Sequence, residues 1–99
     1  MTTRYIALID GKAGAYGVSF PDAAGCAAMG KTMDEAMQNA VVSLAEWMAD
    51  AGEDRPRARS VEELRRDPEV IEQIKEGAEI AAIPLLLEVG APGARQSFD

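Results

Sequence analysis

Apolar side chains recur at every third or fourth position between residues 33 and 51, the spacing that aligns them along one side of a helix. This stripe consists of Met33, Ala36, Met37, Ala40, Val41, Leu44, Trp47, Met48 and Ala51. Thr32 with Glu35 has the capping-box pattern of a helix start, and Gly52 is placed to end the helix. The pattern therefore predicts one long amphipathic helix, the longest element of the chain.

Three shorter segments before this helix have the composition of β-strands. Residues 5–9 and 16–20 are rich in Tyr, Ile, Leu, Val and Phe, and the connector 10–15 carries two glycines, so the pair predicts a hairpin with a rather long loop. Pro21 lacks a backbone donor and ends the second strand, and a weaker strand is expected over residues 26–29. We expect an antiparallel three-stranded meander.

The second half of the chain predicts short helices and one more strand. Residues 53–59 form a charged loop with Pro56, which we expect at the surface. Two helix-start patterns follow before Gly77, a capping box at Ser60 and an Asp-Pro pair at Asp67. The apolar run 80–87 predicts a last strand.

Pro84 within that last strand restricts it to an edge of the sheet or to a bulge, because proline cannot donate to a strand ladder. An edge strand can pair with a second copy of the chain, which makes Ile83, Leu85 and Leu87 the candidate residues for an oligomer contact.

These elements predict an α+β domain in two layers: a meander plus a late edge strand, one long helix packed on one face, and short helices before the last strand. We expect this domain to cover residues 1–89 and residues 90–99 to be a linker or tail, since Gly90-Ala91-Pro92-Gly93 has the composition of a linker.

Composition restricts the partners and the chemistry. A chain of 99 residues has a modest core, so burial by self-association would help it, and a homodimer or higher homo-oligomer is expected. A formal charge of -7 disfavours nucleic acid and favours a basic partner. Cys26 is the single cysteine and histidine is absent, so we expect no metal, no cofactor and a small buried thiol. The sequence shows neither a leader nor a membrane span, which makes the cytoplasm the expected location.

A motif joins the second strand, a turn and the start of the long helix. It runs Tyr16-Gly17-Val18-Ser19-Phe20-Pro21-Asp22 and continues with Gly25, Gly30, Thr32 and Asp34-Glu35-Ala36. This succession resembles the amino-terminal domain of HicB-family antitoxins, over roughly residues 5–87.

The resemblance implies a partial ribonuclease-H-like fold and a non-enzymatic function. It implies the antitoxin of a type II toxin-antitoxin pair, which binds and neutralises a small basic HicA-like toxin that cleaves mRNA. Family members usually also carry a DNA-binding module after the last strand. Here residues 95–99 resemble only the opening strand of a ribbon-helix-helix module, so DNA binding is expected only if a missing carboxyl-terminal module exists.

Charge suggests where such a toxin would bind. Between residues 33 and 54 the chain has six acids, Asp34, Glu35, Glu46, Asp50, Glu53 and Asp54, and no Lys or Arg. A toxin that grips RNA must present positive charge, which an acidic surface can attract. We take Asp22, Glu46, Asp50 and Glu53 as candidate toxin contacts, with a merely solubilising helix surface as the open alternative.

Two other functions remain as alternatives. A metal-dependent nuclease, or its relic, needs several converging carboxylates, and only Asp10 and Glu46 are placed to contribute. A structural oligomerisation domain of a DNA-binding repressor is the other. Phe20 and Trp47 are interpreted as core residues. The alternating Arg55, Arg57 and Arg59 are interpreted as a solvated loop balanced by Glu53 and Asp54.

Overall fold

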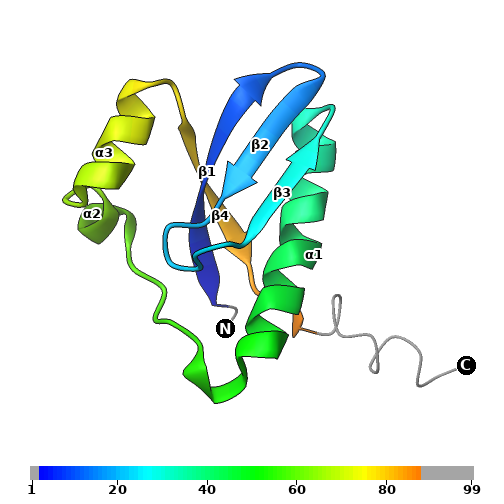
Figure 1. Cartoon of the computed structure of the whole chain (residues 1–99), viewed down its shortest axis with the longest axis vertical. Helices are drawn as coiled ribbons and strands as arrows, with labels where there is room; N and C mark the ends of the chain where they lie inside the picture. Colours follow the sequence, from blue (N-terminus) through cyan, green and yellow to red (C-terminus); the bar gives the residue numbers. More distant parts are fainter. Residues whose placement is uncertain (1–2, 88–99) are drawn as a thin grey trace, which may run out of the picture.

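A computed structural model describes residues 3–87 as a four-stranded antiparallel sheet with helices on both faces (Figure 1). The strand order is β3-β2-β1-β4. The strands are β1 (Arg4–Lys12), β2 (Ala15–Ser19), β3 (Ala27–Gly30) and β4 (Glu79–Pro84). The predicted α+β class, the meander and the late edge strand are confirmed.

The hairpin between β1 and β2 is tighter than the sequence predicted. Strand β1 continues through Lys12, which pairs with Ala15, so the loop expected over residues 10–15 shrinks to two residues. Gly11 permits this continuation: its φ is +94°, and a Cβ there would lie 2.2 Å from the Ala15 carbonyl oxygen. The prediction of a long loop was wrong because Gly11, one of the two glycines of the connector, does not interrupt the ladder but pairs with Tyr16.

Helix α1 (Met33–Ala51) packs across one face of the sheet. Its start is capped as predicted, since the Thr32 hydroxyl accepts from the Glu35 amide at 3.0 Å. The Glu35 carboxylate accepts in turn from the Lys31 amide at 2.6 Å. Gly30 lets the helix come close to β3, because a Cβ at this position would lie 2.3 Å from the Ala36 nitrogen.

The main core lies between α1 and the sheet, and apolar burial there supplies the main driving force for folding. Its buried members are Tyr5, Ala7, Ile9, Val18, Phe20, Ala23, Cys26, Ala28, Ala36, Ala40, Leu44, Met48 and Ile83. The α1 face of this core is therefore the apolar stripe that the sequence predicted.

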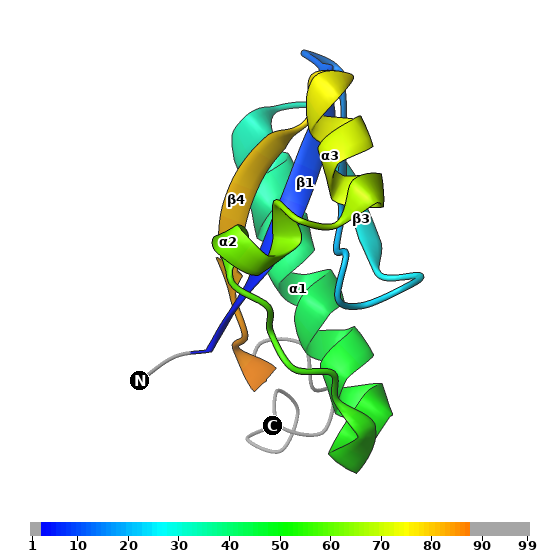
Figure 2. The same ribbon diagram turned by 90° about the vertical axis from the view of Figure 1, so that its left-hand side faces the viewer.

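A second cluster on the opposite face shows that the predicted two-layer arrangement was incomplete. Helices α2 (Val61–Leu64) and α3 (Pro68–Lys75) cover this face, as the two views in Figures 1 and 2 show. The cluster consists of Ile6, Leu8, Leu64, Val70 and Ala78. Residues 5–9 of β1 are consequently all buried, since alternate side chains enter opposite clusters.

Strand β4 forms one edge of the sheet and pairs antiparallel with β1, with Ile83 opposite Tyr5. Pro84 is its last residue, in accord with the restriction of proline to sheet edges. The expected domain end at residue 89, the linker 90–93 and the tail 95–99 lie outside the described residues.

Candidate protein-interaction surface

The outer side of α1 and the 3-10 turn η1 (Gly52–Asp54) carries an acidic surface, made of Asp34, Glu35, Glu46, Asp50, Glu53 and Asp54. All of these residues are exposed. Glu46 and Asp50 are four residues apart in α1, which places them on the same side of the helix, and Glu53 follows in η1 after the helix has ended at Gly52. Three of the four candidate contact residues are therefore exposed on α1 and the turn that directly follows it.

The positive charge of the chain is concentrated elsewhere. Helix α1 and η1 contain no Lys or Arg, whereas six basic residues lie between positions 55 and 75: Arg55, Arg57, Arg59, Arg65, Arg66 and Lys75. The helices of this second segment, α2 and α3, cover the opposite face of the sheet (Figure 2). The same segment also holds five acids, Glu62, Glu63, Asp67, Glu69 and Glu72, so it is close to neutral, whereas α1 and η1 are strongly acidic. Arg55 lies at the carboxyl end of α1, where its Nε donates to the Met48 carbonyl.

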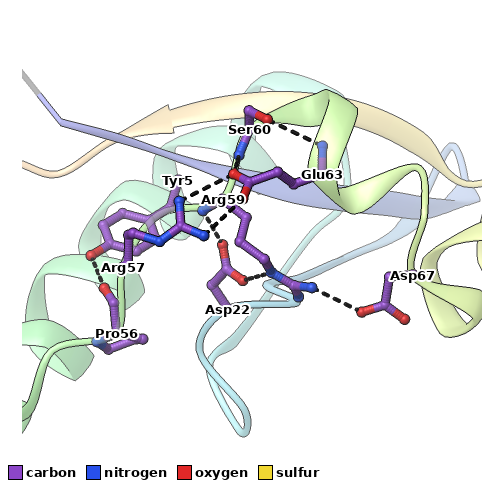
Figure 3. Close-up of polar contacts among 8 residues, drawn as sticks. All are labelled: Tyr5, Asp22, Pro56, Arg57, Arg59, Ser60, Glu63 and Asp67. Atoms are coloured by element: carbon purple, nitrogen blue, oxygen red, sulfur yellow. Dashed lines mark hydrogen bonds and ion pairs between the residues drawn. The ribbon is translucent and has the colours of Figure 1, made fainter.

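Asp22, the fourth candidate contact, has a different environment. Its side chain is only 5% exposed and accepts two hydrogen bonds from Arg59, at 2.8 Å from the backbone nitrogen and at 2.6 Å from Nε. The carboxylate is therefore engaged within the chain. Figure 3 shows it between Arg59 and the turn that follows β2.

The segment 55–60 is a strap that leads from α1 on one face to α2 on the other, past the end of the sheet where β1 begins (Figure 1). Three contacts hold it. The Tyr5 hydroxyl donates to the Pro56 carbonyl at 2.6 Å, Arg55 Nε donates to the Met48 carbonyl at 3.0 Å, and Arg59 bridges Asp22 and Asp67.

The arginines of the strap are thus not balanced by Glu53 and Asp54, as the sequence suggested. Arg57 pairs with Glu63 through two hydrogen bonds of 3.1 and 2.8 Å, and Arg59 pairs with Asp22 and Asp67 (Figure 3). The charged loop is ordered by bonds to residues far along the chain. Sequence reasoning missed these partners because Asp22 and Arg59 are 37 positions apart.

These bonds shift the ionisation of the acids involved. Hydrogen bonds from the Arg57 guanidinium and the Ser60 amide lower the pKa of Glu63 to about 2. The Glu69 amide and the Arg59 guanidinium lower the pKa of Asp67. The hydrogen bond with Asp22 raises the pKa of Arg59. All these groups are therefore charged at neutral pH, and none is poised for proton transfer.

The candidate oligomer residues Ile83, Leu85 and Leu87 share the α1 side of the sheet. Ile83 is fully buried in the main core, and Leu85 and Leu87 are partly buried against it. Their side chains serve the fold, so any contact along β4 would depend on the backbone edge and on the residues between them.

The predicted core residues are confirmed. Phe20 is buried and Trp47 is partly buried against the same cluster. Cys26 is buried, and burial raises the pKa of its thiol, which disfavours the reactive thiolate.

Within residues 3–87, no three acidic, His or Cys side chains converge where they could hold a metal ion. Helix α1 and the other helices of this region are also too short or too polar to cross a membrane.

Comparison with protein families decides the identity. A family model described as HicB_like antitoxin of bacterial toxin-antitoxin system matches residues 5–88. The chain belongs to the HicB-like antitoxins.

Solved structures agree with this assignment. The crystal structure of the Burkholderia pseudomallei antitoxin HicB is 29% identical, with a TM-score of 0.63, and the match covers 88% of this chain and 66% of that one. The crystal structure of its N-terminal domain gives the same identity and TM-score, over 86% of this chain and 100% of that one. A HicA3 and HicB3 toxin-antitoxin complex shares the fold at 19% identity, with a TM-score of 0.66 over 85% of this chain and 99% of that one. No curated protein matches the chain.

In this HicB-like antitoxin, several residues of the motif that carried the resemblance have a structural role. Val18 and Phe20 enter the core, Thr32 and Glu35 cap α1, and Asp22 anchors the strap. The ribonuclease-H-like fold stays a prediction, because neither the matching family nor the similar structures are described as having that fold.

Proposed function

We propose that this chain neutralises a small basic HicA-like toxin that cleaves mRNA, by binding the toxin in the cytoplasm and without catalysing a reaction itself. Family membership and the HicB structures support the antitoxin function. The single observation that carries the binding site is the acidic surface of α1 and η1, which has no basic residue of its own.

The electrostatic argument has two steps. A protein that binds RNA neutralises phosphates with Lys and Arg, so its RNA-binding surface is positive. An acidic helix surface attracts such a surface during the encounter and, once bound, occupies the place of the phosphates. Inhibition then requires coverage rather than chemistry.

Glu46, Asp50 and Glu53 form the part of the acidic surface that we assign to toxin contact. Asp34 and Glu35 lie at the opposite end of the helix, where Glu35 already accepts from the Lys31 amide. For Asp22 we propose an indirect contribution, because its carboxylate holds Arg59 and thereby the strap beside the end of α1.

A complex of this kind needs enough buried area to be stable. A stable protein interface buries about 1,200–2,000 Å² in total. The exposed side of a helix of 19 residues, together with η1, supplies a continuous surface for such a contact.

The test is charge reversal with a matched control. The variant Asp50→Lys/Glu53→Lys is compared with Glu69→Lys/Glu72→Lys, which makes the same change in net charge on exposed positions of α3. The partner is a HicA-like toxin, taken from a short basic reading frame beside the gene if one lies there, co-expressed and purified. Association at low salt should slow about tenfold or more for the α1 variant and much less for the α3 variant.

The dependence of the association rates on salt gives a second readout. Raising the ionic strength should shrink the difference between the two variants, because exposed charges are screened beyond about 10 Å at 0.1 M salt. Equal association rates for both variants at low salt would contradict toxin contact through the acidic surface and favour the alternative, a merely solubilising helix surface. RNA degradation by the purified chain alone would contradict the proposal of a non-catalytic function.

A further inference from the structure

Met29 is the most exposed large apolar residue in the part of the chain that the structure describes, with 70% of its surface open to solvent. Its neighbour Ala28 faces α1 in the main core, so the Met29 side chain points to the opposite face of the sheet. Gly17 lies opposite Met29 on β2 and has no side chain to cover it. Met29 is thus an apolar side chain without a cross-strand partner.

The helices on that opposite face do not reach this part of the sheet. The strand residues of the second cluster, Ile6, Leu8 and Ile80, belong to β1 and β4. In Figure 1, α2 and α3 lie on the left, away from β3. Ser19 and Ala27, which are opposite each other on β2 and β3, are exposed as well. Among the described residues, β2 and β3 are therefore covered on the α1 face only.

A shallow recess lies beside Met29, where β3 leads into α1. The backbone around it is fixed by two hydrogen bonds: the Gly14 amide donates to the Lys31 carbonyl at 2.7 Å, and the Lys31 amide donates to the Glu35 carboxylate at 2.6 Å. Because the walls are already ordered, a side chain that enters the recess imposes little further ordering on this chain. The lining residues are Gly14, Ala15, Met29, Gly30, Lys31 and Glu35.

One exposed side of α1 connects this recess with the acids near the end of the helix. Glu35, Asn39, Val42 and Glu46 follow one another at spacings of four, three and four residues, which keeps them on one side. Asn39 donates to the Met29 carbonyl at 2.7 Å, so this side runs along the β3 edge.

The distance between the two ends of this side is small enough for one partner. From Glu35 to Glu46 the helix rises by roughly 16 Å, at about 1.5 Å per residue. A stable interface covers about 800 Å² on each partner, which corresponds to a patch about 30 Å across. A single protein can therefore contact the recess and Glu46 together.

We propose that Met29 and this recess form the apolar anchor of the toxin contact, an inference that rests on the proposed antitoxin function. The HicA-like toxin inserts one apolar side chain into the recess against Met29, and its basic surface extends along α1 towards Glu46. Charges at the border of an interface mainly speed the encounter, whereas a few desolvated anchors supply most of the binding energy. The recess and the acidic surface thus have separate kinetic effects.

The charge around the recess favours the toxin over other occupants. Lys31 is the only base among its lining residues, and Asp34 and Glu35 follow it at the start of α1. A second copy of this chain would bring the same acids against them, and RNA would bring phosphates, so both would be repelled. A basic protein with an exposed apolar side chain fits both the recess and the acidic surface.

The rate at which the toxin dissociates from the full chain tests the anchor. Met29→Ala should raise the dissociation rate constant about tenfold or more and change the association rate constant by less than about threefold. Met29→Leu keeps an apolar side chain of similar volume and should retain most of the lifetime of the complex. Ile71→Ala truncates another exposed apolar residue, on α3, and should leave the dissociation rate unchanged. Circular dichroism establishes that each variant is folded.

Oxidation gives a second test that needs no substitution. Hydrogen peroxide transfers one oxygen atom to the thioether of an exposed methionine, which yields the sulfoxide and water. In the free chain Met29 should react before Met33, Met37 and Met48, which are partly or fully buried. In the complex the reaction of Met29 should slow several-fold, because the toxin covers it. Mass spectrometry of proteolytic fragments locates the sulfoxide.

The outcomes separate this inference from the proposed function. Unchanged dissociation for Met29→Ala, or a bound toxin that leaves Met29 open to peroxide, would overturn the inference and leave the proposed function intact. Failure of the unmodified chain to bind the toxin would overturn the proposed function and the anchor with it. Protection of Met29 together with equal association rates for the two charge variants would support the anchor and reject contact through the acidic surface.

Discussion

The two faces of the sheet are covered in different ways. On one face a single helix of 19 residues buries a continuous apolar stripe. On the other face, α2 and α3 bury a small cluster. The strap that leads to them is held by polar contacts: Pro56 accepts from the Tyr5 hydroxyl, and Arg57 and Arg59 form ion pairs. The first face depends mainly on apolar burial and the second on a combination of burial and polar bonds.

A short chain can thus bury side chains on both sides of one strand. Strand β1 contributes alternate side chains to each cluster, so its five residues 5–9 are all buried. A segment that leaves α1 must pass around the end of the sheet to reach the second face, and a charged strap can do so in contact with water. Its polar bonds then fix α2 and α3 where apolar area is scarce.

The largest expected effect is the loss of apolar volume under α1. Leu44→Ala should lower the free energy of unfolding by about 3–4 kcal/mol, because Leu44 is fully buried in the main core. Leu64→Ala in the second cluster should cost about 2 kcal/mol, since partly exposed neighbours can close the space. Urea unfolding followed by circular dichroism measures both values. Equal losses would remove the energetic distinction between the faces.

An intermediate effect is expected at the strap. Arg59→Ala should lower the free energy of unfolding by about 1–2 kcal/mol, because it leaves the nearly buried carboxylate of Asp22 without its charged partner. Arg57→Ala is the control, since its pair with Glu63 is exposed and should contribute less than about 1 kcal/mol. Urea unfolding again gives both values. If Arg57→Ala cost as much as Arg59→Ala, burial of Asp22 would not be the cause.

The smallest effect should appear as a dependence on pH. The pKa of Glu63 falls from an ordinary value of 4.5 to about 2 in the folded chain. A lowered pKa means that this stabilisation is fully present above pH 4.5 and is lost as the pH falls toward about 2. Thermal unfolding between about pH 5 and pH 2 should therefore show a steeper fall for the unmodified chain than for Glu63→Gln. Parallel curves would contradict the assignment.

Much of the first face could be predicted from the sequence. The stripe of α1, the cap at Thr32 and the edge position forced by Pro84 all follow from local patterns. These features depend on neighbours along the chain, which periodicity and capping describe directly.

The second face could not be predicted in this way. One local signal indicates that β1 is buried on both sides: its run Tyr5–Ile9 lacks the polar alternation of a half-exposed strand. The sequence does not say which elements cover the second side. The pairing of Arg59 with Asp22 and Asp67 joins distant segments, and charge counting alone placed its partners wrongly at Glu53 and Asp54.

The candidate site residues also differ in how far the sequence predicted their environment. Glu46, Asp50 and Glu53 were found from charge and are exposed together on α1 and η1, whereas Asp22 was chosen by charge but faces the strap. Exposure on a helix follows from its period, but exposure in a turn depends on what the rest of the chain brings against it.

The hydrogen bond from Asn39 to the Met29 carbonyl has a consequence for how far strand addition can propagate. A sheet with two receptive margins can recruit copies without end and grow into a fibre. Here the side chain of Asn39, on the helix that packs beside β3, occupies a carbonyl of that margin, so a further strand finds fewer free backbone groups there. One amide of α1 thereby protects this margin against strand addition.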